Sequence, residues 1–521
     1  MTTEIYLDAN ATSPVLPAAI VAAQAALLQC FGNPSSSHAA GLRARALLDD
    51  ARSRARRVLG AASGRLMFTS GATEGIQTAV LSALCAVRER RAAGLPCGDL
   101  LLYGATEHKA VPESLAHWNA LLGTGLTLQA LPVDADGRHC LAALRTLAPR
   151  TAFLCTMAAN NETGIVSDLD GIAAVLGDTG SDALWMVDCV QALGKLPLAL
   201  DRSRIDYAPF SGHKLYAPKG VGMLWVRAEA PYTPLMCGGG QEAGQRSGTE
   251  NMAGIAAFGA VLRALEEGRT FRSHAQLAAM RERLAASLRS AFPGIEFNAP
   301  FEHALPTTLN FSVPDRSGKA LLDLFDAAGV RVSAGSACSA AQAAPSHVLL
   351  SMGLPEVRCA NAVRMSFGPL ADDAFIDEAC ARIARCGQAL LAPPPAACPV
   401  TGSGAQVDAK PAPGTAPVPA PCALDAHGLA RFLGAHPDAL LIDVREACEH
   451  ALGTPRLHGR AAYSLPLSRL PEHAAWLCRE TRPLVFFCRS GNRSAQAARI
   501  AQELGHGTVR HLAGGLALLA S

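Results

Sequence analysis

Short apolar runs alternate with helical stretches along the first part of this 521-residue chain. Four runs have the length and composition of buried strands: Arg65–Ser70, Leu100–Gly104, Thr151–Met157 and Ala183–Asp188. Helical stretches lie before and between them, and Ala44–Leu59 has the pattern of an arginine-rich amphipathic helix. This alternation predicts an α/β fold, in which helices wrap a mainly parallel sheet. Such sheets bind their ligands at the carboxyl ends of the strands.

The rest of the chain divides into three parts. A smaller α+β region is predicted after Ser290, with strands at Leu309–Val313 and Val363–Phe367. Residues 393–421 are dominated by Pro, Ala and Gly, which indicates an extended tether. The remainder has the length of one small domain. We therefore predict a two-part unit at 1–390, a linker at 391–422 and a second domain at 423–521.

Composition excludes several classes of protein. With 50% hydrophobic and 17% charged residues the chain is globular, and its net charge of +2 argues against nucleic acid or an anionic membrane as a partner. The N-terminus lacks the pattern of a secretory signal, and no apolar run approaches the ~20 residues of a membrane span. The 16 cysteines show no zinc-ligand spacing. We expect a cytoplasmic protein with free thiols and no structural metal.

The motif Ser70-Gly71-Ala72-Thr73-Glu74 lies between the first strand candidate and a helical stretch. Free N–H groups at a helix N-terminus, together with the Thr73 hydroxyl, can bind a phosphate. The alternative is a capping box, in which Ser70 or Thr73 only caps the helix.

Three further polar motifs follow the later strand candidates. His108 suits stacking on a flat ring or acid–base chemistry, or it is a hydrogen-bonded core histidine. Asn161 presents an amide to a ligand or forms a simple turn. Asp188 can accept a hydrogen bond from a protonated pyridine nitrogen, which keeps the ring electron-withdrawing, or it caps a helix. Gln191 is close enough along the chain to reach an oxygen of the same ring.

Lys214 follows Ser211 and His213 in the loop SGHKLYAPKG, residues 211–220. A lysine amine is a good nucleophile near neutral pH only when desolvation or neighbouring charge lowers its pKa. When a lysine holds an aldehyde cofactor as a Schiff base, the residues beside it usually bind the phosphate of that cofactor. The alternative is an ordinary surface lysine.

The order of these motifs is that of a pyridoxal-phosphate site, and the chain resembles the cysteine desulfurases, which are fold-type-I pyridoxal-phosphate enzymes. The matching stretches are spread over nearly all of the N-terminal part. They are YLDANAT (6–12), FGNPSSSH (31–38), FTSGATEG (68–75), TEHKAV (106–111), NNETG (160–164), VDCVQ (187–191), SGHKLYAPKG (211–220), GGGQEAGQRSGTEN (238–251) and SAGSACS (333–339).

The resemblance implies a role for each matching residue. Lys214 would form the Schiff base with the cofactor, pyridoxal 5'-phosphate. The phosphate ligands would be Ala72, Thr73, Ser211, His213 and, from the second subunit of a homodimer, Thr249. The cofactor ring would meet His108, Asn161, Asp188 and Gln191. The substrate L-cysteine would meet Asn33, Asn161 and Arg364, since an arginine fork matches a carboxylate.

The resemblance also implies a catalytic thiol, Cys338, in a mobile loop. Its thiolate would attack the substrate sulfur, release alanine and remain as a persulfide, which requires a depressed pKa or a base such as His108. The loop from Cys338 to His347 is similar to that of the longer-loop group, which serves iron–sulfur assembly. Cys338 itself could transiently ligate an iron–sulfur cluster.

The C-terminal part holds a tight loop after an apolar strand, CRSGNRS at 488–494. Backbone N–H groups of such a loop can converge on an anion at Cys488. Four residues separate Cys488 from Arg493, one fewer than in phosphatase loops, so the loop suits sulfur. The proposed loop residues are Cys488, Arg489, Ser490, Gly491, Asn492 and Arg493.

This part resembles a rhodanese domain through LIDVRE (441–446), LPL (465–467), CRSGNRS and HLAGGL (511–516). The stretch GTPRLHGRAA (453–462) departs from the family pattern, and the chain ends soon after Gly515, so docking and substrate access are in question. An inactive docking module is the alternative.

Together the two resemblances predict a cysteine desulfurase that relays sulfur from Cys338 to Cys488. Acceptors would be an iron–sulfur scaffold or a sulfur carrier, for cluster assembly, thio-cofactor synthesis or tRNA thiolation. Three other functions are a selenocysteine lyase, a non-catalytic scaffold and a phosphatase in the second domain.

Overall fold

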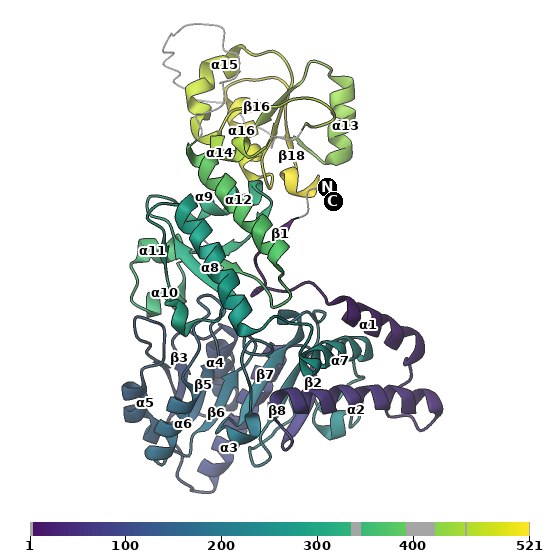
Figure 1. Ribbon diagram of the computed structural model, residues 1–521, viewed down its shortest axis with the longest axis vertical. Helices are drawn as coiled ribbons and strands as arrows, with labels where there is room; N and C mark the ends of the chain where they lie inside the picture. The colour runs from purple at the N-terminus through teal and green to yellow at the C-terminus, as the bar shows by residue number, and fades with distance from the viewer. Residues whose placement is uncertain (1–3, 335–344, 392–421, 454–455, 520–521) are drawn as a thin grey trace.

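The computed structural model describes residues 4–334, 345–391, 422–453 and 456–519, and Figure 1 shows their arrangement. Its largest sheet has seven strands in the order β2-β8-β7-β6-β5-β3-β4. The strands are β2 Arg65–Thr69, β3 Leu100–Gly104, β4 Thr127–Leu131, β5 Thr151–Met157, β6 Leu184–Asp188, β7 Tyr207–Ser211 and β8 Gly222–Val226. All neighbours are parallel except those of β8, which runs antiparallel to both β2 and β7. The four strand predictions and the α/β fold class are confirmed.

Helices cover both faces of this sheet because successive strand residues point to opposite sides. Leu66 and Phe68 of β2 face one hydrophobic core, whereas Met67 faces the other. The first core contains helices α2 Ala39–Leu59, α6 Leu169–Asp178 and α7 Met252–Glu267, on which α1 Pro17–Gln29 packs. The second contains α3 Ala72–Ala92 and α4 Ala110–Leu122. Helix α5 Leu141–Leu147 lies beside α6 and packs into the first core.

Local signals set the ends of these helices. Asp168 and Asn251 accept hydrogen bonds from the first-turn N–H groups of α6 and α7. Gly60 ends α2 with a φ of 56°, a left-handed conformation that favours glycine.

A second unit follows, built on the four-stranded antiparallel sheet β12-β13-β10-β9. Its strands are β9 Glu296–Phe297, β10 Thr308–Ser312, β12 Ser333–Ala334 and β13 Val363–Ser366. Its helices are α8 His274–Ala291, α9 Gly318–Ala327, α10 His347–Ser351, α11 Glu356–Ala360 and α12 Asp373–Leu391. Two short parallel strands, β1 Ile5–Tyr6 and β11 Val330–Arg331, bring the N-terminal segment into this unit. We call it the small domain.

The C-terminal domain is a parallel sheet in the order β14-β18-β17-β15-β16. Its strands are β14 Cys422–Leu424, β15 Leu440–Asp443, β16 Tyr463–Ser464, β17 Leu484–Phe487 and β18 Val509–Leu512. Its helices are α13 Ala426–Ala435, α14 Ala447–Ala451, α15 Ala474–Arg479 and α16 Asn492–Glu503. Figure 1 shows this domain at the end of α9 and α12, remote from the seven-stranded sheet. Among the described residues, no helix combines the length and apolar character needed to cross a bilayer.

Candidate functional site

A cavity of about 530 Å³ lies at the carboxyl ends of β5, β6 and β7 and reaches the N-terminus of α3. Residues from distant parts of the sequence line it. Those that the sequence predicted are Ala72, Thr73, His108, Asn161, Asp188, Gln191, Ser211, His213, Lys214 and Arg364. The position agrees with the rule that parallel sheets bind ligands where their strands end.

Lys214 ends a short 3₁₀ turn, Gly212–Lys214, that directly follows β7. Its Nζ donates hydrogen bonds to the backbone carbonyls of Asn10 and Ala11, at 2.9 and 2.7 Å. The N-terminal segment therefore holds the amine at the wall of the cavity. The alternative of an ordinary surface lysine does not fit this position.

Asp188 ends β6 and is 7% exposed. Burial raises the pKa of its carboxyl to about 6, while the N–H of Val190 and the charge of Lys214 act in the opposite direction. One carboxylate oxygen accepts the hydrogen bond of Val190 N–H at 2.9 Å. A buried carboxylate that faces a cavity is stabilised by a bound cation, so this position fits the protonated ring nitrogen of pyridoxal phosphate.

The opposite part of the cavity fits a phosphate. Gly71 is the N-cap of α3 and no side chain caps this helix, which leaves first-turn N–H groups for a ligand. The capping alternative for Ser70 and Thr73 is thus not observed. Burial, followed by the charges of Lys214 and Lys219, lowers the pKa of His213 to about 4, so its ring is neutral near pH 7. Its Nδ1 lies 3.1 Å from Thr12 Oγ1.

Arg364 is 1% exposed and reaches the cavity from β13. Its guanidinium donates to Asp8 Oδ1 at 2.7 Å and to the backbone carbonyl of Asn161 at 3.0 Å. Its Nε has no hydrogen-bond partner among the described residues. The side chain is therefore fixed by two partners and retains donor capacity that suits a carboxylate.

Three residues without a predicted role complete this network. Asn10 is 1% exposed, and its backbone carbonyl accepts from both Lys214 and Gln191. Lys195 Nζ donates to Gln191 Oε1 at 2.7 Å, which turns the amide nitrogen of Gln191 toward Asn10. Asp8 pairs with Arg364. Asp8 and Asn10 belong to YLDANAT, a stretch that matched the resembled family without a defined role, so only that match could have indicated them.

His108 lines the cavity, and its Nδ1 accepts the N–H of Ala110 at 3.1 Å. Burial, together with the charges of Lys214, His347 and Lys109, lowers its pKa. A neutral imidazole can both stack on a ring and accept a proton.

Thr249 and Asn33 do not line the cavity of their own chain. Thr249 lies in a separate cavity of about 160 Å³ beside Ser70 and Gly220. Asn33 is exposed, and its side chain accepts the N–H of Ser35 in a turn. A third expected site residue, Cys338, lies outside the described residues.

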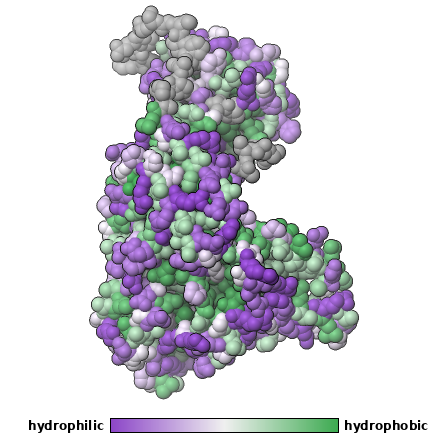
Figure 2. All heavy atoms as spheres, viewed as in Figure 1, coloured by the Kyte–Doolittle hydropathy of each residue, from purple (hydrophilic) through white to green (hydrophobic). Residues whose placement is uncertain are grey.

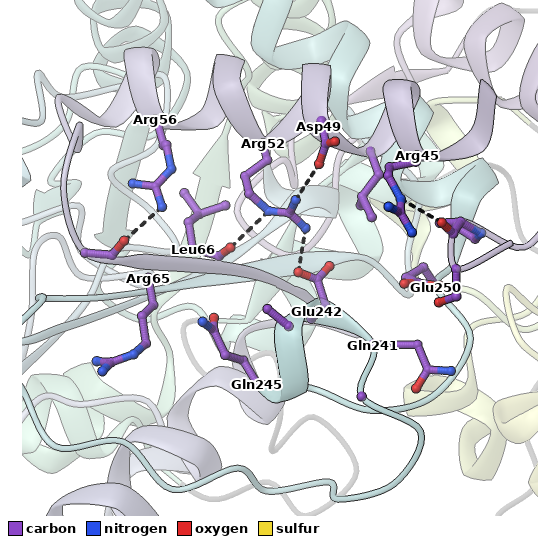
Figure 3. Close-up of a pocket in the computed structure, with 16 residues that line it drawn as sticks. Arg45, Asp49, Arg52, Arg56, Arg65, Leu66, Gln241, Glu242, Gln245 and Glu250 are labelled. Atoms are coloured by element: carbon purple, nitrogen blue, oxygen red, sulfur yellow. Dashed lines mark hydrogen bonds and ion pairs between the residues drawn. The ribbon is translucent and has the colours of Figure 1, made fainter. Parts of the chain in front are cut away.

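Ion pairs hold the loop that carries Thr249. Figure 3 shows one of them, between Arg52 and Glu242, which both line a cavity of about 490 Å³. These two side chains meet at 2.6 Å, and Arg52 also pairs with Asp49 at 2.9 Å. Arg246 pairs with Glu74 at 2.9 Å. The position of the loop is therefore tied to α2 and α3.

Glu162, in the NNETG motif, is a buried carboxyl beside the cavity and is 4% exposed. Burial raises its pKa to about 7, although Ser346 Oγ donates to it at 2.6 Å. A carboxyl whose folded-state pKa lies above its unfolded value of 4.5 costs stability as pH rises from about 4.5 to about 7.

We therefore expect Glu162→Gln to raise the thermal midpoint of the N-terminal unit at pH 8, by the equivalent of about 1–3 kcal/mol. The gain should shrink as pH falls and approach zero near pH 4, below the unfolded-state pKa of 4.5, where Glu162 carries a proton in most of both the folded and the unfolded protein. Calorimetry from pH 4 to 8 measures it. A gain that does not change with pH would show that ionisation of Glu162 is not its cause.

The second predicted site lies where β17 meets α16. Cys488 is 1% exposed, and its Sγ accepts the N–H groups of Gly491 at 3.2 Å and Ser494 at 3.4 Å. These donors favour an anion on sulfur. Both loop arginines, however, are bound to carboxylates, Arg493 to Glu449 at 2.5 Å and Arg489 to the small domain.

Comparison with known proteins assigns each of the two parts of the chain to a family. Residues 5–378 match the family Aminotransferase class-V, and residues 426–520 match the Rhodanese-like domain. The cysteine desulfurase of Gluconacetobacter diazotrophicus is 39% identical over 72% of this chain and 90% of its own length. That of Cereibacter sphaeroides is 37% identical over 72% of this chain and 93% of its own.

Two solved structures are similar to the N-terminal part. A NifS-like protein has a TM-score of 0.66 and 30% identity, and the match covers 75% of this chain and all of that one. The structure titled "SspA in complex with cysteine" has a TM-score of 0.60 and 27% identity, over 71% of this chain and all of that one.

Proposed function

Because this chain belongs to the class-V aminotransferase family as a pyridoxal-phosphate-dependent cysteine desulfurase, and ends in a rhodanese-like domain, we propose that it moves sulfur from L-cysteine through two of its own thiols. The first would be Cys338 and the second Cys488. The observation that supports this most strongly is the single cavity that collects Lys214, Asp188, His213 and Arg364.

Bound pyridoxal phosphate supplies an electron sink for the bond changes at the substrate. In the proposed mechanism Arg364 binds the substrate carboxylate, and Asp8 fixes the direction of the guanidinium. Lys214 moves the proton between the substrate carbons, because its amine faces the cavity. His108 lines the same cavity, where its imidazole can hold a proton taken from a thiol.

The sulfur step follows from thiolate chemistry. The Cys338 thiolate attacks the sulfur of the substrate, the carbon–sulfur bond breaks, and its electron pair leaves with the carbon, which takes a proton and becomes alanine. A Cys488 thiolate would then attack the outer sulfur of the Cys338 persulfide and release Cys338 as thiolate. Strand β12 supports this step, because its residue Ser333 is the strand partner of Arg364 in β13. The chain therefore leads toward Cys338 from a point beside the arginine that we propose binds the substrate.

The relay is tested by incubating the enzyme with cysteine and measuring persulfides by mass spectrometry. We expect sulfur on Cys488 in the wild type and on Cys338 alone in Cys488→Ser, with alanine release retained in that variant. Normal alanine release with no sulfur on wild-type Cys488 would refute the relay.

Arg364 gives a second test, on the substrate side. Arg364→Gln should raise the KM for cysteine about 100-fold, as expected for a lost charge-assisted contact. Because the change leaves Asp8 without its buried partner, Asp8→Asn should accompany it in a matched double variant. Steady-state alanine release measures both, and a KM within about threefold of wild type in the double variant would exclude the contact.

We further propose a homodimer, in which Thr249 of each chain completes the phosphate site of the other. Thr249 lies outside the cavity that holds Lys214 in the same chain, which supports this proposal. Exposed apolar residues of α1, of the segment just after it and of α2 also support the dimer. Figure 2 shows hydrophobic residues (green) among hydrophilic ones (purple) in the region that α1 and α2 occupy in Figure 1. The exposed apolar residues are Ile20, Val21, Leu27, Leu28, Phe31 and Leu42. A cytoplasmic location and an iron–sulfur scaffold or sulfur carrier as acceptor complete the proposal.

A further inference from the structure

The Cys488 loop contacts the small domain through its two arginines. Arg489 Nη1 lies 3.1 Å from Asp323 Oδ1, and its Nε lies 2.8 Å from Asp326 Oδ2. Arg493 Nη2 lies 3.5 Å from Asp323 Oδ2, while it also pairs with Glu449 of its own domain. The two aspartates lie three residues apart, so they share one face of α9.

Most of this contact is covered from water. The side chains of Asp323, Asp326 and Arg493 are 11%, 19% and 14% exposed, and that of Arg489 is 37% exposed. Ion pairs covered to this degree are less screened by solvent than surface pairs. Lys319 also binds Asp323 at 2.7 Å, and Arg331 also binds Asp326.

Apolar packing continues the contact around α14. Cys448 and Leu452 pack against the hydrophobic core of the small domain, and α14 contacts both α9 and α12. Beside them a cleft of about 770 Å³ separates the two domains, with Arg382 on one wall and Leu516 on the other. The contact therefore combines a packed edge, a charged centre and an open cleft.

The charged centre has a chemical consequence. Arg489 and Arg493 are the cations that flank Cys488, and a small anionic sulfur compound would approach the thiol through them. In this structure two carboxylates of α9 hold both guanidiniums, and Cys488 is 1% exposed. An incoming anion must compete with Asp323 and Asp326 for the same cations.

We propose that Asp323 and Asp326 form a docking surface on α9 for the Cys488 loop, and that docking withholds Cys488 from small anionic sulfur compounds until the contact opens. The docked loop faces α9, so it exchanges sulfur only after release. The proposal rests on the suggested role of Cys488 as a sulfur carrier, and the contacts themselves need no sulfur transfer.

Alkylation of the full-length holoenzyme at low ionic strength tests this without any sulfur donor. Iodoacetate serves as the anionic probe and iodoacetamide as the neutral one, and peptide mass spectrometry gives the rate at each cysteine. Exposed Cys478 of the same domain is the internal control. The test variant is Asp323→Asn with Asp326→Asn.

The matched control variant is Asp373→Asn with Asp377→Asn, which removes two carboxylates of α12 that pair with Arg283 and are each 72% exposed. We expect the test variant to alkylate Cys488 with iodoacetate roughly fivefold faster than wild type, with a smaller gain for iodoacetamide. Added salt should speed the wild type toward the same rate.

Cys478 should react equally in all three proteins, which shows that the reactivity of an exposed thiol in the same domain is unchanged. A Cys488 rate in the test variant within about twofold of wild type, or the same acceleration in the α12 control, would overturn the proposal. The relay has a separate readout, the persulfide on Cys488, so failure of either proposal can be told from failure of the other.

Discussion

Replacing Lys214 by alanine is expected to lower alanine release from cysteine by at least about 1000-fold. The amine of Lys214 is the nitrogen that the carbonyls of Asn10 and Ala11 hold at the cavity wall, at 2.9 and 2.7 Å. The change removes the amine that we propose both anchors the cofactor covalently and carries the proton. Steady-state alanine release gives the size of the loss.

Two comparisons separate the chemistry of Lys214 from its charge. Lys214→Arg keeps the charge but cannot form a Schiff base, so it should be as inactive as alanine. Lys319→Ala, on α9, should release alanine like wild type, since the Lys319 side chain is 74% exposed and does not line the cavity. Borohydride should fix the cofactor to the Lys214 peptide in wild type. Activity above a tenth of wild type in Lys214→Arg would contradict the assignment.

The sequence predicted the cavity because its residues lie at strand ends. Asp188 and Ser211 end buried strands, and Asn161 lies in the loop after the strand that ends at Met157; parallel strands bring such positions to one edge of a sheet. Periodicity and short motifs carry that information. Arg364 needed the family resemblance, because a single arginine inside a strand has no distinctive local pattern.

Most of the parts that were missed depend on contacts between distant segments. Asn10 acts on Gln191 through its backbone carbonyl, which leaves no trace in residue type. The contact of Lys195 with Gln191 is local, within one turn, and belongs to no recognised motif. The ion pairs of Arg489 with α9 join two domains across a linker, and periodicity within either domain cannot show them. The predicted domain boundaries and the roles of the individual site residues, Thr249 and Cys338 among them, stay predictions.

The loop arginines show how the same residue pattern allows two physical outcomes. The sequence indicated that Arg489 and Arg493 add positive charge near Cys488. In the fold that charge is balanced by Asp323, Asp326 and Glu449. Whether the loop attracts an anion thus depends on the packing of another domain.

The second large effect is expected at Asp188, where asparagine should lower kcat by roughly 100- to 1000-fold with the KM for cysteine nearly unchanged. The carboxylate faces the cavity from the end of β6, where its charge can hold a protonated ring nitrogen and so sustain the electron demand of the cofactor. Asparagine keeps the shape and can still accept the N–H of Val190, so the fold should persist.

The pKa of Asp188 gives an independent readout in the binding of the cofactor. Burial raises this pKa to about 6 before a cation is bound, so the carboxylate takes up a proton as pH falls through 6. Wild-type affinity for pyridoxal phosphate, followed by equilibrium dialysis, should then weaken more below pH 6 than that of Asp188→Asn. Asp182→Asn, at the opposite end of β6 and 83% exposed, is the matched control and should behave as wild type. If Asp188→Asn retained half of the wild-type kcat, the carboxylate would not be the group that holds the ring cationic, and the electron sink would have to be maintained by His108 and Gln191 alone.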